Sequence, residues 1–177
     1  MVRKISLLIS RRLYGGIAQL VEHMLCKHGV VGSNPITSTM ASQDWIYYGV
    51  FLEERSKENL LMFVKHFVKI PKNWRIYCDH MTIVFNDLSE RAYLWGQNLE
   101  PFIGQKVRLR VTHIGVSEKS VAVMVTGYSS ANEFPHVTVA IAPCAKPVDS
   151  NKIQKWTEID DGLSMVGTID FVERRKK

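Results

Sequence analysis

The sequence predicts an α+β fold from residue 40 onward. Three observations support this prediction. Runs rich in aromatic and β-branched residues alternate with stretches whose apolar residues recur at helical spacing. The 177 residues are 46% hydrophobic and 23% charged, which is ordinary for a globular domain. A chain of this length can bury one hydrophobic core without disulfides or a structural metal.

The first half of this region is predicted to alternate strands and helices. Trp45–Leu52 (WIYYGVFL) is dense in aromatic and β-branched residues, so we expect a strand. Glu58–Lys69 has apolar residues on one helical face. Trp74–Phe85 (WRIYCDHMTIVF) is strand-like throughout. Glu90–Asn98 is predicted to be a second helix, with Ser89 or Asp87 as its N-cap.

The second half is predicted to consist mostly of strands. Val107–Val116 alternates apolar and polar residues, and Ser120–Thr126 follows after a short turn. Tyr128–Phe134 (YSSANEF) has the composition of a loop, and His136–Ala142 is a further strand. The last two expected elements are a short helix and a strand, at Ser150–Trp156 and Ser164–Glu173.

Residues 1–39 differ from the rest of the chain. They carry +4 of the net charge of +6, so basicity does not indicate that residues 40–177 coat nucleic acid. The run GGIAQLVEHMLCKHGVVGSNPITST has no sustained helix or strand period and resembles the conceptual translation of a transfer-RNA gene. We therefore expect a disordered or non-native extension, with Met40 as the natural start of the domain. The alternative is a mitochondrial presequence, because the segment is rich in Arg and poor in acids.

The sequence also indicates a cellular environment. No apolar run reaches the roughly 18 residues of a membrane span, so we expect no membrane association. Cys26, Cys78 and Cys144 form no C-x-x-C pair, and scattered cysteines of odd number suit free thiols in a reducing compartment. We therefore expect a cytoplasmic protein in which Cys78 and Cys144 are small buried hydrophobic residues.

Two copies of one tetrad carry the chemical information. Residues 80–83 (HMTI) and residues 136–139 (HVTV) both consist of His, apolar, Thr, apolar, and both lie in predicted strands. Because residues two apart in a strand point to the same side, each tetrad directs its His and Thr to one face. The two apolar residues are then buried on the other face.

Such pairs suit an in-line displacement at phosphorus. An imidazole can transfer a proton near neutral pH, and a Thr hydroxyl can donate to an anionic oxygen. We predict His80 and His136 as the catalytic acid and base, in an order that the sequence does not decide, and Thr82 and Thr138 as phosphate-binding residues. This chemistry needs no metal, and the chain has no H-x-x-E-H run or Asp-rich loop, so we expect no metal and no cofactor.

The other histidines are assigned no function. A lone His in a strand is more often structural than catalytic. His66 lies beside aromatic residues in a predicted helix, and His113 lies in a strand without a Thr two residues later.

The strings DHMTIVF and PHVTVAI resemble the paired His-x-Thr/Ser-x signature of the two-histidine (2H) phosphoesterase superfamily, the LigT-like or cyclic phosphodiesterase-like proteins. The resemblance covers Trp45–Glu173. More distantly, the chain is similar to the cyclic phosphodiesterase modules of RNA repair enzymes. The resemblance implies a bilobal α+β fold, in which two pseudo-symmetric lobes with antiparallel sheets surround a central cleft.

The same resemblance implies the activity. We expect a monomeric, metal-independent phosphodiesterase that hydrolyses 2′,3′-cyclic phosphate ends of RNA or related cyclic and 2′–5′ nucleotides. The chain departs from some family members in having no arginine next to the tetrads. Lys146, Arg108 and Arg110 are candidate substitutes, although the two arginines fit a solvated strand face better.

Substrate contacts beyond the phosphate are predicted from aromatic residues, which can stack on a base. Tyr47, Tyr48 and Tyr128 are candidates, and we favour Tyr48 or Tyr128. The loop 128–134 precedes the second tetrad and is expected to form a lip over the cleft.

Two other classes of function stay open. One is a catalytically inactive module that binds RNA or a nucleotide in the same cleft. The other is an interaction domain whose double tetrad is coincidental, in which case the two histidines would lie far apart. The natural substrate and the position of the phosphate in the product are not decided by the sequence.

Overall fold

The structure is a computed structural model that describes residues 45–174. The predicted extension at residues 1–39 and the predicted start at Met40 lie outside the described residues and stay predictions. Within the described part of the chain, no helix is long and apolar enough to cross a membrane.

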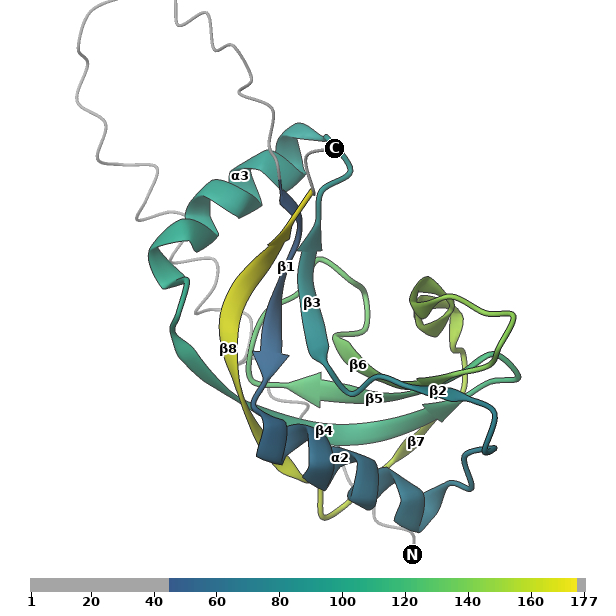
Figure 1. Cartoon of the computed structure of the whole chain (residues 1–177). Helices are drawn as coiled ribbons and strands as arrows, with labels where there is room; N and C mark the ends of the chain where they lie inside the picture. The colour runs from purple at the N-terminus through teal and green to yellow at the C-terminus, as the bar shows by residue number, and fades with distance from the viewer. Residues whose placement is uncertain (1–44, 175–177) are drawn as a thin grey trace, which may run out of the picture. The chain divides into compact units, whose positions relative to one another are not determined.

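Six antiparallel strands close into one barrel (Figure 1). Neighbouring strands follow the order β6-β3-β1-β8-β4-β5, and β5 pairs with β6 to complete the ring. Two short strands extend it, because β2 pairs with β6 and β7 pairs with β4. The bounds are β1 (Trp45–Leu52), β2 (Arg75–Ile76), β3 (His80–Phe85), β4 (Lys106–Val116), β5 (Ser120–Thr126), β6 (His136–Ile141), β7 (Trp156–Glu158) and β8 (Ser164–Glu173).

The predicted bilobal α+β fold with a central cleft between two lobes is therefore wrong. The closed ring leaves no boundary between lobes, because β8 pairs with β1 on one side and with β4 on the other. The expected first half contributed β1 and the expected second half contributed β8, yet these two strands are hydrogen-bonded along most of their length. Local alternation predicts the faces of a strand but not its partners, which is why the sequence did not reveal the closure.

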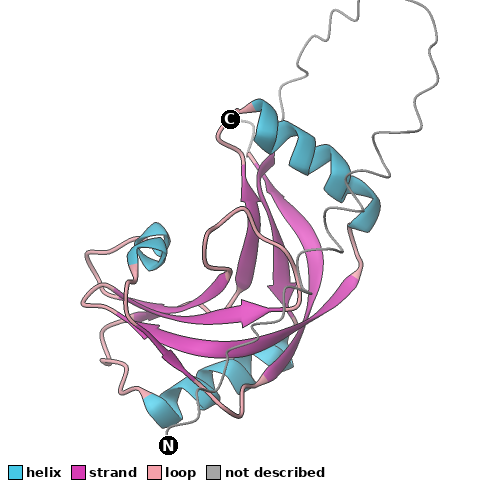
Figure 2. Ribbon diagram, turned by 180° about the vertical axis from the view of Figure 1, so that it is seen from behind, coloured by secondary structure: helices cyan, strands magenta, loops and turns pink. Residues whose placement is uncertain are grey.

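Two helices lie at opposite ends of β1, as Figures 1 and 2 show. Helix α2 (Glu54–Phe67) starts at Glu54, earlier than the predicted Glu58, and its Leu60 and Val64 are fully buried in the core. The first turn of α2 is held by a contact distant in sequence, since the Ser56 hydroxyl accepts a hydrogen bond from the backbone N–H of Val166.

Helix α3 (Glu90–Leu99) begins as expected. The Ser89 hydroxyl accepts a hydrogen bond of 3.1 Å from the backbone N–H of Ala92, so Ser89 is the N-cap. A 3-10 turn, η1 (Glu100–Phe102), follows α3 directly.

Two predicted elements are corrected by the structure. The expected strand 74–85 is divided into β2 and β3, because Cys78 between them has φ 57° and cannot continue an extended strand. The expected helix 150–156 is instead the 3-10 helix η2 (Pro147–Lys152) followed by β7. Pro at the start of η2 is compatible with a short helical turn, and the side chain of Asp149 accepts a hydrogen bond from the Lys146 N–H.

The apolar faces of the strands form the core. In both tetrads the residues that follow His and Thr are fully buried, namely Met81, Ile83, Val137 and Val139. The His and Thr of each tetrad therefore point to the opposite face, where the candidate site lies.

Candidate active site

Strands β3 and β6 bring the two tetrads together. They are hydrogen-bonded neighbours, and Met81 pairs with Val137 in antiparallel register. Stepping one residue along each strand places His80 opposite Thr138 and Thr82 opposite His136. The four side chains occupy the corners of a square, with the two histidines on one diagonal and the two threonines on the other.

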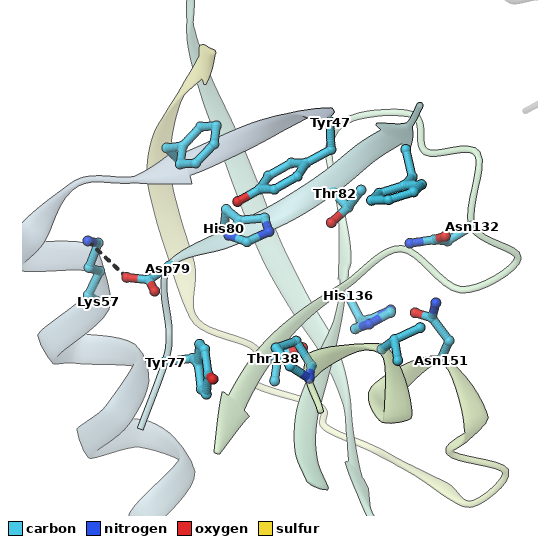
Figure 3. A pocket seen from close by; sticks show the side chains of 14 residues that line it. Tyr47, Lys57, Tyr77, Asp79, His80, Thr82, Asn132, His136, Thr138 and Asn151 are labelled. Carbon is cyan, nitrogen blue, oxygen red and sulfur yellow. Dashed lines mark ion pairs between the residues drawn. The ribbon is translucent and has the colours of Figure 1, made fainter. Parts of the chain in front are cut away.

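All four of these side chains line one pocket of about 690 Å³ (Figure 3). The pocket therefore lies on the outside of the β3–β6 pair, while the core residues lie on its inside. In Figure 3, both imidazoles and both Thr side chains surround the same space. A single phosphate in this space would have an imidazole on each of two sides.

The ring of His136 is fixed in one orientation. Its Nδ1 lies 2.7 Å from the carbonyl oxygen of Phe134. A carbonyl oxygen only accepts hydrogen bonds, so Nδ1 carries the proton. The Nε2 atom of the neutral ring then keeps its lone pair, which is the state that a general base needs.

The ring of His80 is held by stacking rather than by a carbonyl. The Tyr47 ring stacks on it with centroids 4.8 Å apart and planes at 21°, and the Phe51 ring lies 5.3 Å away. Gly49 leaves room beneath the imidazole. A Cβ at this position would lie 3.4 Å from His80 Cδ2 and 3.0 Å from the Met81 carbonyl oxygen. The neighbouring strand β1 thus positions the first catalytic candidate.

Burial lowers the pKa of both histidines. For His80, burial is the main cause, the Asp79 carboxylate opposes it, and the charges of His136 and Lys57 lower the pKa further. For His136, burial lowers the pKa and the hydrogen bond to Phe134 opposes it. The charge of His136 lowers the pKa of His80 because the two rings lie close together. With both pKa values lowered, both rings are mostly neutral at neutral pH.

The two threonines differ in their surroundings. The Thr138 hydroxyl donates a hydrogen bond of 3.0 Å to the hydroxyl of Ser150, which is fully buried in η2. The Thr82 backbone carbonyl accepts a hydrogen bond of 2.8 Å from the Ser130 hydroxyl. Both strand positions are thus held by residues from outside the tetrads.

Loop 128–134 links the two tetrads. The backbone N–H of Ala131 donates to the Ile83 carbonyl on β3, and the Phe134 carbonyl holds His136 on β6. Asn132, in the middle of this loop, lines the pocket. The loop therefore forms part of the pocket wall, as expected for a lip.

The cation at the pocket is Lys57, which sequence analysis missed. It lies on α2, and its Nζ is 3.2 Å from Asp79 Oδ1 (Figure 3). Burial opposes the charged form, but the hydrogen bond and charge of Asp79, together with Glu54, raise the Lys57 pKa overall. Arg108, Arg110 and Lys146 do not line the pocket. Local sequence patterns could not reveal Lys57, because Lys57 and Asp79 are distant in sequence and meet only in the fold.

The two favoured tyrosines lie away from the pocket. Tyr48 is 3% exposed and packs against Trp45 and Phe171, and Tyr128 packs against the core. Neither lines the pocket. The aromatic residues that do line it are Tyr47, Phe51, Tyr77 and Phe85. Strand alternation explains the difference, since Tyr47 and Tyr48 point to opposite faces of β1.

The expectation of buried cysteines is confirmed for Cys78 and wrong for Cys144, which is exposed. Cys78 has an unreactive thiol. It is buried, and burial raises the pKa of the thiol to about 12, so it stays protonated. The described residues contain no cluster of three or more His, Cys, Asp or Glu side chains that could hold a metal ion.

Comparison with known proteins is informative for the fold. No protein family model matches this chain, and no curated protein matches it. Among solved structures, the chain is similar to one described as "Crystal Structure of Fungal RNA Kinase", with a TM-score of 0.50 and 15% sequence identity. The similarity covers 89% of this chain and 50% of that chain, so the present chain spans about half the length of its structural neighbour. At this identity the two share a fold.

Proposed function

We propose that the chain is a 2H-type phosphodiesterase that opens a 2′,3′-cyclic phosphate at an RNA end. The observation that carries the proposal is the diagonal arrangement of the two His/Thr pairs on β3 and β6 around one pocket. In-line displacement requires proton transfer on opposite sides of phosphorus, and the diagonal supplies one imidazole for each side.

The proposed roles follow from the surroundings of each ring. His136, with its proton on Nδ1, uses the Nε2 lone pair to accept a proton from the attacking water. Burial lowers the pKa of His80 and the Asp79 carboxylate opposes this, and in its protonated form His80 donates a proton to the leaving ribose oxygen. One P–O bond forms and one breaks, and the product is a phosphate monoester beside a free hydroxyl. The site thereby passes one proton from water to the leaving group.

The remaining polar groups suit the phosphate itself. The hydroxyls of Thr82 and Thr138 lie on the other diagonal, and Thr82 can donate to a non-bridging oxygen. Thr138 can donate to the second one by turning its proton away from the Ser150 hydroxyl, which then donates to Thr138 instead. Lys57 is a cation at the pocket wall that can contact an anionic substrate, and its charge is balanced by Asp79, which lines the same pocket. These interactions strengthen as the phosphorus centre becomes more negative in the transition state.

The structural neighbour supports the proposal that the substrate is RNA, but it does not indicate which reaction the chain catalyses. Its description names an RNA kinase, but the present chain spans half of it. The sequence has no G-x-x-x-x-G-K-[ST] run to cradle a nucleoside triphosphate, so we do not propose kinase activity. RNA as substrate also agrees with the resemblance to cyclic phosphodiesterase modules of RNA repair enzymes.

The test is a turnover assay on an oligoribonucleotide that ends in a 2′,3′-cyclic phosphate, in the presence of EDTA. We expect the wild type to open the ring and both His80→Ala and His136→Ala to lose at least a hundredfold in kcat. His113→Ala is the matched control, because His113 lies on β4 outside the pocket. Binding without turnover by a folded wild-type chain would contradict the proposal and would support the inactive binding module instead.

A further inference from the structure

Positive charge is concentrated in the segment that leads to the pocket wall at Tyr77, although residues 40–177 are nearly balanced overall. Between Glu58 and Asp79 the chain contains no acidic residue. The four cations in that interval are all exposed. We call them the basic strip: Lys65, Lys69, Lys72 and Arg75.

The basic strip has no ion-pair partners within the described residues. Lys57, Lys106 and Lys152 each lie within 4 Å of a carboxylate, whereas the described carboxylates form no such pair with any cation of the strip. Four neighbouring charges of one sign attract a polyanion and are stabilised by it.

The strip ends at the pocket wall. The Arg75 guanidinium lies over the Tyr77 ring, 5.1 Å from its centroid, and Tyr77 lines the pocket. The Tyr77 N–H donates to the Val139 carbonyl on β6, which fixes this end beside the second tetrad. At the other end, Lys65 is near enough for its charge to act on the Cys78 thiol. In Figure 1 this segment runs from the end of α2 to β2, beside β6.

An exposed aromatic ring lies within the strip. Phe67 is 51% exposed and follows Lys65 by two residues. Cations interleaved with an exposed aromatic ring are typical of surfaces that bind single-stranded nucleic acid, where phosphates meet the charges and a base stacks on the ring.

We propose that the basic strip binds the phosphates of a single RNA strand whose 3′ end enters the pocket. The substrate is then an RNA strand rather than a small cyclic nucleotide, because a mononucleotide has only the phosphate that the pocket holds. This inference rests on the proposed function. An anionic membrane would meet the charges equally well, but the continuity of the strip with the pocket wall favours a polymer whose end is processed there.

The first experiment measures binding of a labelled single-stranded oligoribonucleotide with a 3′-phosphate, by fluorescence anisotropy over a range of salt. The variant Lys65→Gln/Lys69→Gln/Lys72→Gln should raise Kd at least tenfold near 0.1 M salt. The slope of log K against log salt should become shallower by about 0.7 for each phosphate that the variant no longer neutralises. Phe67→Leu should raise Kd several-fold without changing the slope.

The matched control removes three exposed charges elsewhere. The variant Arg108→Gln/Arg110→Gln/Lys119→Gln changes β4 and the turn after it, and it should bind RNA within about twofold of the wild type. Equal losses of affinity in the two triple variants would overturn the inference. A strip variant that binds RNA with the same Kd as the wild type would also overturn it. Strip-dependent binding to phosphatidylserine vesicles, without RNA binding, would overturn it in favour of a membrane.

The second experiment separates this inference from the proposed function. In the strip variant, kcat/KM for the cyclic-ended oligoribonucleotide should fall at least tenfold, while that for a 2′,3′-cyclic mononucleotide stays within about twofold. If the strip variant turns over both substrates as fast as the wild type, the proposed function stands and the inference that the basic strip binds RNA is overturned. If the wild type turns over neither substrate but binds RNA, and the strip variant loses this binding, the inference about the basic strip is supported and the proposed function is overturned.

Discussion

At the scale of single residues, the site depends on how differently the fold holds two similar histidines. His136 is tied through Nδ1 to a backbone carbonyl, while His80 stacks on the Tyr47 ring of β1, with the Phe51 ring beside it and a carboxylate next to it in sequence. A carbonyl fixes a tautomer, and a carboxylate favours protonation. This difference is the physical basis for assigning a base and an acid.

The lowered pKa of both histidines predicts the pH dependence of kcat/KM. The base must be neutral and the acid protonated, so activity is highest between the two apparent pKa values of the pair. Because burial holds both values below the ordinary one of about 6.5, the maximum should lie below about pH 6.5, and activity should fall above it. Measured kcat/KM that keeps rising from pH 7 to pH 9 would contradict this account of the site.

The assignment of roles predicts a response to the leaving group. A p-nitrophenyl phosphodiester expels a weakly basic oxygen that leaves without protonation. On this substrate His80→Ala should recover most of its lost activity relative to the wild type, while His136→Ala should stay inactive, because the attacking water still needs a base. The measurement is the rate of nitrophenolate release. Recovery in His136→Ala instead would reverse the two roles.

At the scale of elements, much of the structure could be predicted from the sequence. The bounds of β1 and β8 agree with the expected strands. Strand β1 is a dense run of aromatic and β-branched residues, and buried and less buried residues alternate along most of β8. The N-cap Ser89 was also recognisable. By contrast, the break at Cys78 depends on a left-handed backbone conformation that the strand-like composition of residues 74–85 concealed.

The cap of α3 gives a prediction about stability alone. Replacing Ser89 by Ala removes the acceptor for the Ala92 N–H and should lower the free energy of unfolding by about 1 kcal/mol. Ser89 lies outside the pocket, so kcat/KM should stay unchanged. Urea unfolding and the turnover assay check the two statements, and a loss of activity at unchanged stability would contradict both.

At the scale of the whole molecule, the four tetrad side chains were predictable but their setting was not. The period of two placed His80 and Thr82 on one face, as it did His136 and Thr138. Which strands are neighbours depends on contacts between distant segments, so neither the ring of six strands nor the approach of Lys57 was visible in local patterns. The same limit explains why Tyr47 rather than Tyr48 lines the pocket.

Closure of the barrel predicts one cooperative unfolding transition. Since β8 joins β1 to β4, no group of strands can unfold without breaking the pairing of the rest. Urea curves followed by circular dichroism and by Trp fluorescence should coincide. Leu60→Ala, which removes a fully buried side chain, should shift both curves together by about 2–5 kcal/mol. Two separate transitions would instead indicate two independent lobes.

The central claim is that His80 and His136 act together on one phosphate. The most direct measurement is kcat on the cyclic-ended oligoribonucleotide for each His→Ala variant and for the double variant. Residues that act as a unit are strongly non-additive. We therefore expect each single variant to lose at least a hundredfold and the double variant to lose less than about tenfold more. Losses that multiply, or a single variant that keeps wild-type activity, would contradict the claim.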